Sequence, residues 1–143
     1  MNAIASLILT IALEVGIQPY FALAIALEEN WTLNENAISK PNKNGSRDYG
    51  LFQLNDSVYD MEKINWRDPA TNIRLGCEHI KYLLGRPEMT TYFDVAVSYN
   101  AGCSWLVNGH DPPAKSVEYA CKVIQRWNEL SGGNAMTLIR RDL

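Results

Sequence analysis

The sequence is poor in the residue types that usually hold metals and bind nucleic acids. Its 143 residues include three cysteines and two histidines, His79 and His110. Neither histidine has metal-ligand spacing to the other or to a cysteine, so we expect no metal site, and we expect no cofactor. Lysine and arginine total 13 against 16 aspartates and glutamates. The resulting net charge of −3 argues against a nucleic-acid-binding protein, which normally presents a basic face.

The cysteines are also too few and too irregularly spaced for a disulfide framework or a Cys-x-x-Cys motif. Cys77 is in helical phase with Ile73 and Ile80, and Cys121 with Val117 and Ile124. We therefore expect both to be core thiols. A disulfide between Cys103 and Cys121 stays open.

No apolar run is long enough to cross a bilayer. The longest candidate, residues 3–15, is interrupted by Glu14 and has no basic residue before it, as a secretory signal would have. We expect it to be the first core helix. The sequence also has no internal repeat, low-complexity tract or phosphate-binding glycine loop.

What is present is the composition of a folded domain, with 47% hydrophobic and 20% charged residues. We expect one catalytic domain over residues 1–131, followed by a tail or trimmed linker over 132–143.

Residues that typically begin or end helices occur along most of the chain. Gly16 ends the helix over 3–15, and Pro19 suits the first turn of a second helix that runs to about Asn30. This second helix is apolar nearly all round, so it should be central and buried. Further helices are expected over 69–84, 91–101 and 116–130. The polar segment 31–48 should be a loop with a tight turn at Asn44-Gly45, followed by a short helix near 51–60.

Two adjacent carboxylates close the apolar second helix. Glu28 and Glu29 face the negative end of the helix dipole and have apolar neighbours, and both effects raise a carboxyl pKa, as a general acid requires. Adjacent helical residues point about 100° apart, so only one of the two can face a cleft. A third acid, Asp48, precedes Tyr49-Gly50; taken alone, an aspartate there is more often a turn former than a catalyst.

The chain contains four further motifs in order, at residues 17–30, 50–53, 99–102 and 116–123. Together they resemble the soluble lytic transglycosylase (SLT) domain over residues 3–127. Residues 17–30 resemble its opening helix; aligning Pro19 and Ala24 places the family's catalytic glutamate on Glu29, with Asn30 at the usual serine. Ala37-Ile38-Ser39 resembles the Ala-Val-Ser that follows, with one extra residue in the preceding loop.

The remaining motifs carry the resemblance through the chain. Gly50-Leu51-Phe52-Gln53 resembles the Gly-Leu-Met-Gln motif, whose glutamine lines the sugar cleft. Tyr99-Asn100-Ala101-Gly102 matches the Tyr-Asn-Ala-Gly motif, whose tyrosine lies close to the catalytic acid. Residues 116–123, with Tyr119, resemble the closing helix.

Asp48 departs from the commonest family pattern, which has a small residue there. Residues 45–50 (Gly-Ser-Arg-Asp-Tyr-Gly) instead resemble the turn that carries the catalytic aspartate of animal c-type lysozymes. This resemblance implies Glu29 as general acid and base and Asp48 as nucleophile or electrostatic stabiliser. The remaining candidates, all for substrate binding, are Gln53, Tyr99, Asn100, Ser46, Tyr49 and Trp105.

The sequence thus predicts a mainly α, α+β lysozyme-like domain with a small irregular β region near 38–52. Its expected substrate is peptidoglycan, cut between N-acetylmuramic acid and N-acetylglucosamine by a muramidase. Two alternatives are a lytic transglycosylase and an inactive glycan-binding or structural phage tail domain. We expect a monomer that acts at the bacterial wall as a phage lysin or virion-associated enzyme, without a nucleic-acid partner or membrane span.

Overall fold

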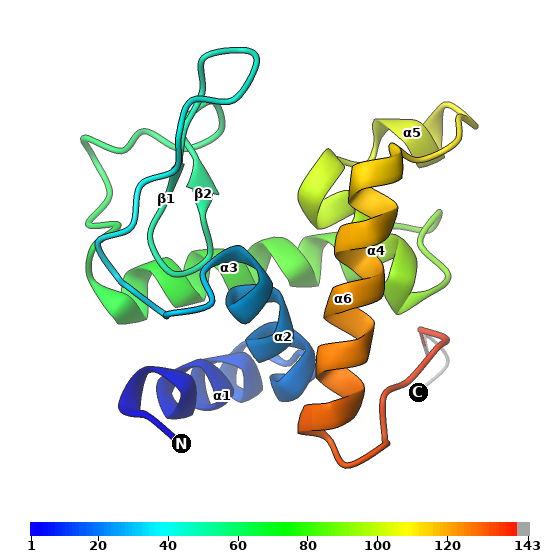
Figure 1. Cartoon of the computed structure of the whole chain (residues 1–143), viewed down its shortest axis with the longest axis horizontal. Coiled ribbons are helices and arrows are strands. Elements are labelled where there is room, and N and C mark those ends of the chain that lie inside the picture. Colours follow the sequence, from blue (N-terminus) through cyan, green and yellow to red (C-terminus); the bar gives the residue numbers. More distant parts are fainter. Residues whose placement is uncertain (140–143) are drawn as a thin grey trace.

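The computed structural model describes residues 1–139, which form six helices and one two-stranded antiparallel sheet (Figure 1). The helices are α1 (Ala3–Val15), α2 (Pro19–Glu29), α3 (Pro69–Gly85), α4 (Tyr92–Ala101), α5 (Ser104–Val107) and α6 (Ala114–Leu130). The sheet pairs β1 (Asp48–Tyr49) with β2 (Leu54–Asn55). The mainly α architecture with a small β region, as predicted, is confirmed. None of the helices in residues 1–139 is both long and apolar enough to cross a membrane.

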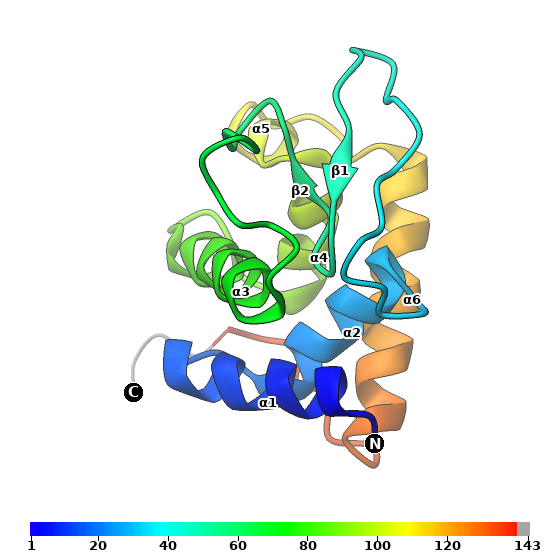
Figure 2. The same ribbon diagram turned by 90° about the vertical axis from the view of Figure 1, so that its left-hand side faces the viewer.

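Helix α2 is the centre of the core, as its apolar sequence predicts. Its six residues 21–26 are buried, and α1 and α6 pack against it (Figures 1 and 2). The Phe21 ring packs edge to face on Trp127 of α6, with ring centroids 5.1 Å apart. The ring of Tyr92, on α4, packs on the same tryptophan with centroids 4.8 Å apart. Such buried aromatic contacts fix how α4 and α6 sit on α2.

The helix ends follow the local signals in the sequence. The side chains of Asn2, Asp68 and Thr91 each accept a backbone N–H in the first turn of α1, α3 and α4. Gly16 ends α1 with φ of 93°, a conformation that glycine adopts without steric cost. These contacts lie within four residues of each end, so the boundaries of α1, α3 and α4 were predictable to within two residues, whereas α5 was not predicted.

The prediction of a short helix near 51–60 is wrong. Leu54 and Asn55 instead form β2, paired with Tyr49 and Asp48. The Phe52 N–H is also taken by the Asn72 side chain, 2.8 Å away. Backbone groups engaged with distant parts of the chain are unavailable for helical hydrogen bonds. The β region accordingly extends past the expected residue 52.

Of the two cysteines predicted to be buried, one is buried and one is exposed. All three cysteines are free, so Cys103 and Cys121 form no disulfide. Cys77 is buried as expected, but Cys121 lies on the exposed side of α6. The neighbours used to predict its burial, Val117 and Ile124, are themselves only partly buried, because α6 turns Ala120 and Val123 towards the core.

The last described residues run beside the start of α4. The Tyr92 N–H donates to the Thr137 carbonyl at 3.1 Å, and Leu138 forms a bridge with Thr91. Residues 140–143 of the expected tail lie outside the described residues. The boundary expected at residue 131 stays a prediction.

Candidate active site

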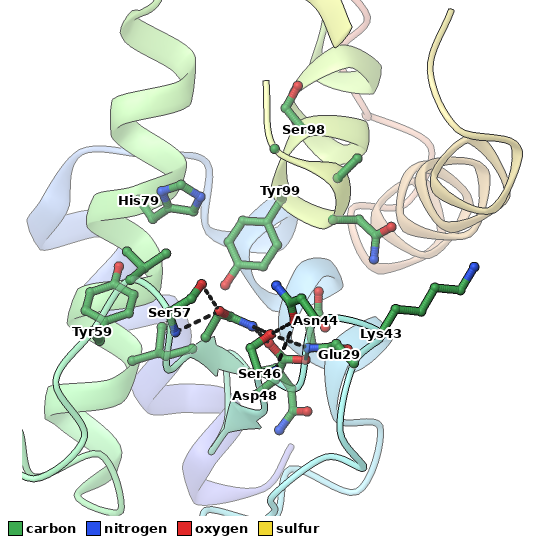
Figure 3. Close-up of a pocket in the computed structure, with 18 residues that line it drawn as sticks. Glu29, Lys43, Asn44, Ser46, Asp48, Ser57, Tyr59, His79, Ser98 and Tyr99 are labelled. Atoms are coloured by element: carbon green, nitrogen blue, oxygen red, sulfur yellow. Dashed lines mark hydrogen bonds between the residues drawn. The ribbon is translucent and has the colours of Figure 1, made fainter. Parts of the chain in front are cut away.

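A cleft of about 830 Å³ lies between the β region and the helices. Its lining residues come from segments far apart in the sequence: the end of α2, the loop before β1, the β2 region, α3, and the end of α4 (Figure 3). Six of the residues expected in the site line it: Glu29, Ser46, Asp48, Gln53, Tyr99 and Asn100. Tyr49 and Trp105 do not line it.

Glu29 is the last residue of α2, and its carboxylate accepts a hydrogen bond from the Tyr119 hydroxyl of α6 at 2.7 Å. Burial of the carboxyl group raises its pKa from 4.5 to about 8. The Tyr119 bond opposes this rise, and the negative charges of Asp48 and Glu28 add to it. Glu29 therefore keeps its proton at neutral pH and can donate it.

Glu28 points to a different neighbour. Its carboxylate pairs with the Arg126 guanidinium of α6 at 3.4 Å, and it does not line the cleft. The two adjacent acids thus have different partners on the same helix, because side chains about 100° apart meet different turns of α6.

Asp48 is held in a network of polar side chains on β1. Its carboxylate accepts hydrogen bonds from the Asn55 amide at 2.8 Å and the Asn42 amide at 3.1 Å. Both amides also donate to the Ser46 hydroxyl, at 3.0 and 3.1 Å. The Ser39 hydroxyl accepts the Asp48 N–H at 2.9 Å. These contacts fix the carboxylate on the wall of the cleft.

The amides that hold Asp48 are not among the residues predicted from the sequence for the site. Asn55 stands directly opposite Asp48 in the β1–β2 register, so the strand pairing was the signal that locates it. Asn42 reaches Asp48 through the tight turn around Gly45, whose φ is 84°. The Gly45 N–H donates to the Asn42 carbonyl at 2.9 Å, which confirms the turn expected at Asn44-Gly45.

The turn between the strands is locked onto α3 by Asn72. The buried Asn72 amide donates to the carbonyls of Tyr49 and Trp66, at 3.1 and 3.0 Å, and accepts the Phe52 N–H. Gly50 lies against it with φ of 76°, and a Cβ atom there would come within 2.2 Å of the Asn72 amide nitrogen. Gly50 is therefore required both by its backbone conformation and by this close approach.

The Asn30 side chain ties the same turn to the end of α2. Its amide donates to the Gly50 carbonyl at 3.2 Å. Three residues after Gly50, Gln53 adopts a positive φ of 51°, and its side-chain amide also donates to the Gly50 carbonyl, at 3.0 Å. Glu29, on α2, and the strand that carries Asp48 are thus connected by a short set of hydrogen bonds.

Tyr99 and Asn100 lie at the end of α4. The Tyr99 hydroxyl donates to the Phe52 carbonyl at 2.8 Å, and Asn100 accepts the Ser116 hydroxyl of α6 at 2.7 Å. Figure 3 shows Tyr99 pointing from α4 towards the group formed by Ser46, Asp48 and Glu29. Tyr99 and Asn100 therefore line the same cleft as the two carboxyl groups, and their expected part in substrate binding stays a prediction.

The two expected aromatics outside the cleft have other contacts. The Trp105 indole N–H of α5 donates to the Ser98 hydroxyl at 3.2 Å. The Tyr49 hydroxyl donates to Asp56 at 3.3 Å, and its ring packs edge to face on Trp66. Their expected part in substrate binding stays a prediction.

The cleft also contains a histidine that the sequence analysis did not select. His79 of α3 lines the cleft beside Tyr99, with ring centroids 5.3 Å apart. No three His, Cys, Asp or Glu side chains within residues 1–139 gather closely enough to hold a metal ion. That the chain needs no metal stays a prediction.

Comparison with known proteins gives two findings. The family model described as the transglycosylase SLT domain matches residues 6–108, which is most of the chain. A protein named lysozyme from Galleria mellonella is 73% identical over 22 residues, a stretch that covers 15% of this chain and 18% of that relative. The chain thus spans less than a fifth of the length of that lysozyme.

Proposed function

Because this chain belongs to the transglycosylase SLT domain family, whose members degrade peptidoglycan, we propose that it cleaves the glycan strands of the bacterial cell wall. The bond cut is the β-1,4 bond between N-acetylmuramic acid and N-acetylglucosamine. One observation carries the proposal: a single cleft holds two carboxyl groups in contrasting surroundings. The half-buried Glu29 has a pKa raised to about 8 by desolvation of its carboxyl group, whereas Asp48 accepts hydrogen bonds from two amides. Unlike surroundings of this kind assign different tasks to two carboxyl groups.

The roles follow from these surroundings. Glu29 keeps its proton near neutral pH and donates it to the glycosidic oxygen as the bond breaks. Asp48, held as an acceptor by Asn42 and Asn55, faces the positive charge that develops on the sugar and stabilises it or bonds to it. Glu29, then deprotonated, activates the acceptor hydroxyl. The division of roles is the one implied by the resemblance to c-type lysozymes.

The acceptor decides the reaction type. Water as acceptor makes the enzyme a muramidase, and the sugar's own 6-hydroxyl makes it a lytic transglycosylase with an anhydro product. The preorganised Asp48 supports the muramidase, because a second carboxylate serves a mechanism that ends with water. The match to the transglycosylase SLT family model supports the alternative.

Mass spectrometry of the fragments released from purified walls tests this choice. A muramidase gives muropeptides with a reducing end. A transglycosylase gives anhydro ends, lighter by one water. Exclusively anhydro products would contradict the muramidase assignment while leaving the peptidoglycan substrate in place.

The substitution Asp48→Asn tests the second carboxylate. It should lower the rate of wall lysis by about 10²-fold or more, because the negative charge that faces the developing positive charge is lost. Asp111→Asn is the matched control, since Asp111 is exposed and does not line the cleft. Near-normal lysis by Asp48→Asn at an unchanged melting temperature would leave Glu29 as the sole essential carboxylate and favour the transglycosylase.

The rival from another class is an inactive domain that binds glycan or serves as a structural part of a phage tail. A turbidity assay on purified walls separates it from an enzyme, because an inactive domain leaves the suspension turbid. The two carboxyl groups in one cleft support the enzyme. Phage origin and the monomeric state stay predictions from the sequence.

A further inference from the structure

Helix α3 presents one face to the cleft side of the β region. Asn72, Gly76 and His79 recur at spacings of four and three residues and so share this face. Asn72 hydrogen-bonds the turn after β1, and Gly76 lets Phe52 pack so closely that an added Cβ would come within 2.3 Å of its ring. The next turn of the same face carries His79 past Phe52 into the cleft.

The His79 ring is held from two sides. Tyr99 packs on it at 5.3 Å between centroids with a tilt of 54°, and Tyr82 stacks at 6.3 Å with an angle of 17°. Tyr99 is itself fixed by its bond to the Phe52 carbonyl. These two ring contacts restrict the orientation of the imidazole before a ligand binds, which lowers the entropy cost of a hydrogen bond to that ligand.

The hydrogen-bonding capacity of His79 is unused within the described residues 1–139. Other polar side chains of the cleft, such as Gln53, Asn55 and Tyr99, each have a partner. Among residues 1–139 neither ring nitrogen of His79 has one, and the residue is only half-buried and lines the open cleft. Burial lowers the pKa of His79, which favours the neutral ring with one donor and one acceptor.

We propose that His79 is a substrate-binding residue whose imidazole hydrogen-bonds a hydroxyl or acetamido group of the glycan strand, on the sugar that lies against Tyr99. The inference rests on the proposed function, since it names a further contact of the same cleft. A hydroxyl or an acetamide both donates and accepts, as the neutral imidazole does. The contact would favour glycan strands that carry a hydroxyl or acetamido group at this position. A strand without such a group would leave the imidazole unpaired in the complex, which weakens binding.

The test measures binding separately from chemistry. In a Glu29→Gln background, which binds but does not cut, calorimetry gives the dissociation constant for a β-1,4-linked N-acetylglucosamine hexasaccharide. Adding His79→Phe, which keeps the ring and removes both nitrogens, should raise this constant about threefold to tenfold, the range for one lost hydrogen bond. His110→Phe is the matched control, because His110 is the other histidine, is exposed and does not line the cleft.

The outcomes separate binding from packing. Unchanged affinity in His79→Phe overturns the inference, and so does a parent protein that does not bind the hexasaccharide. His79→Gln keeps a donor and an acceptor but loses the ring, so it should bind more tightly than His79→Phe. Weakening by Gln as great as by Phe would show that a donor and an acceptor at this position do not restore binding, and would also overturn the inference. Wall lysis by the wild-type protein is scored separately, so its absence refutes the proposed function without deciding the binding result.

Discussion

At the residue scale, the chain shows how two adjacent glutamates acquire different chemistry. Glu28 forms an ion pair with Arg126, whereas Glu29 lines the cleft and accepts a hydrogen bond from Tyr119. Both partners lie on α6, seven residues apart. The difference therefore comes from which turn of α6 each glutamate meets, not from the properties of the residue type.

The first prediction contrasts these two residues. Glu29→Gln should lower wall lysis by about 10²–10⁴-fold or more, because the amide keeps the shape but cannot donate the proton. Glu28→Gln should change lysis little, since Glu28 does not line the cleft. Lysis rates on purified walls decide between them, and the reverse pattern would show that Glu28 is the acid.

The second prediction concerns the pH at which activity is lost. Glu29 must be protonated to act, so kcat/KM should be retained at neutral pH and fall as the pH rises through about 8. The Tyr119 bond favours the charged form and lowers the pKa of Glu29. Tyr119→Phe should therefore move the fall in kcat/KM to higher pH. A pH–rate profile that stays in place or moves to lower pH would contradict this account of the site.

At the element scale, the site depends on how closely α3 approaches the turn after β1. Asn72 supplies the hydrogen bonds, and Gly76 supplies the space for Phe52. This contact positions β1, which carries Asp48, and the face of α3, which carries His79. A rigid junction outside the cleft thus sets the geometry within it.

The third prediction tests that junction. In Gly76→Ala the added methyl group would lie 2.3 Å from the Phe52 ring, so the unfolding free energy should fall by about 1–3 kcal/mol. Gly85→Ala on the same helix meets no atom within 4 Å and should be neutral or stabilise by about 0.4–1 kcal/mol. Urea unfolding measures both. Equal stability of the two variants would mean that α3 can move away from the turn at little cost.

At the scale of the whole molecule, the buried carboxyl group links global stability to pH. The Glu29 pKa is about 8 in the folded protein against an ordinary value of 4.5. Between these values the folded state holds a proton that the unfolded chain has released, so stability falls as the pH rises from about 4.5 to about 8. Placing the acid in the cleft therefore lowers the free energy of unfolding, and this loss grows as the pH rises towards neutral and alkaline values.

The fourth prediction follows from this linkage. Glu29→Gln removes the titrating group, so the variant should unfold at nearly the wild-type temperature at pH 4 and at a higher temperature than wild type at pH 8. Thermal unfolding followed by circular dichroism at several pH values measures the difference. A difference that shrinks as the pH rises would contradict the raised pKa.

The sequence by itself determined the helical framework. Caps at Asn2, Asp68 and Thr91, the glycine after α1 and the apolar run of α2 act through contacts within about four residues. Such contacts can be read directly from the order of residues, and so can the order of the family motifs. For this reason the central helix and the ends of the long helices on either side of it were predicted well.

The tertiary structure alone decided the burial and the hydrogen-bond partners of the site residues. Tyr119 reaches Glu29 across 90 positions of sequence, and Asn72 holds Phe52 across 20. The exposed Cys121, the strand in place of a helix at Leu54–Asn55, and the entry of His79 into the cleft have the same origin. Burial, hydrogen-bond partners and pKa depend on which distant segments meet, and no local periodicity carries that information.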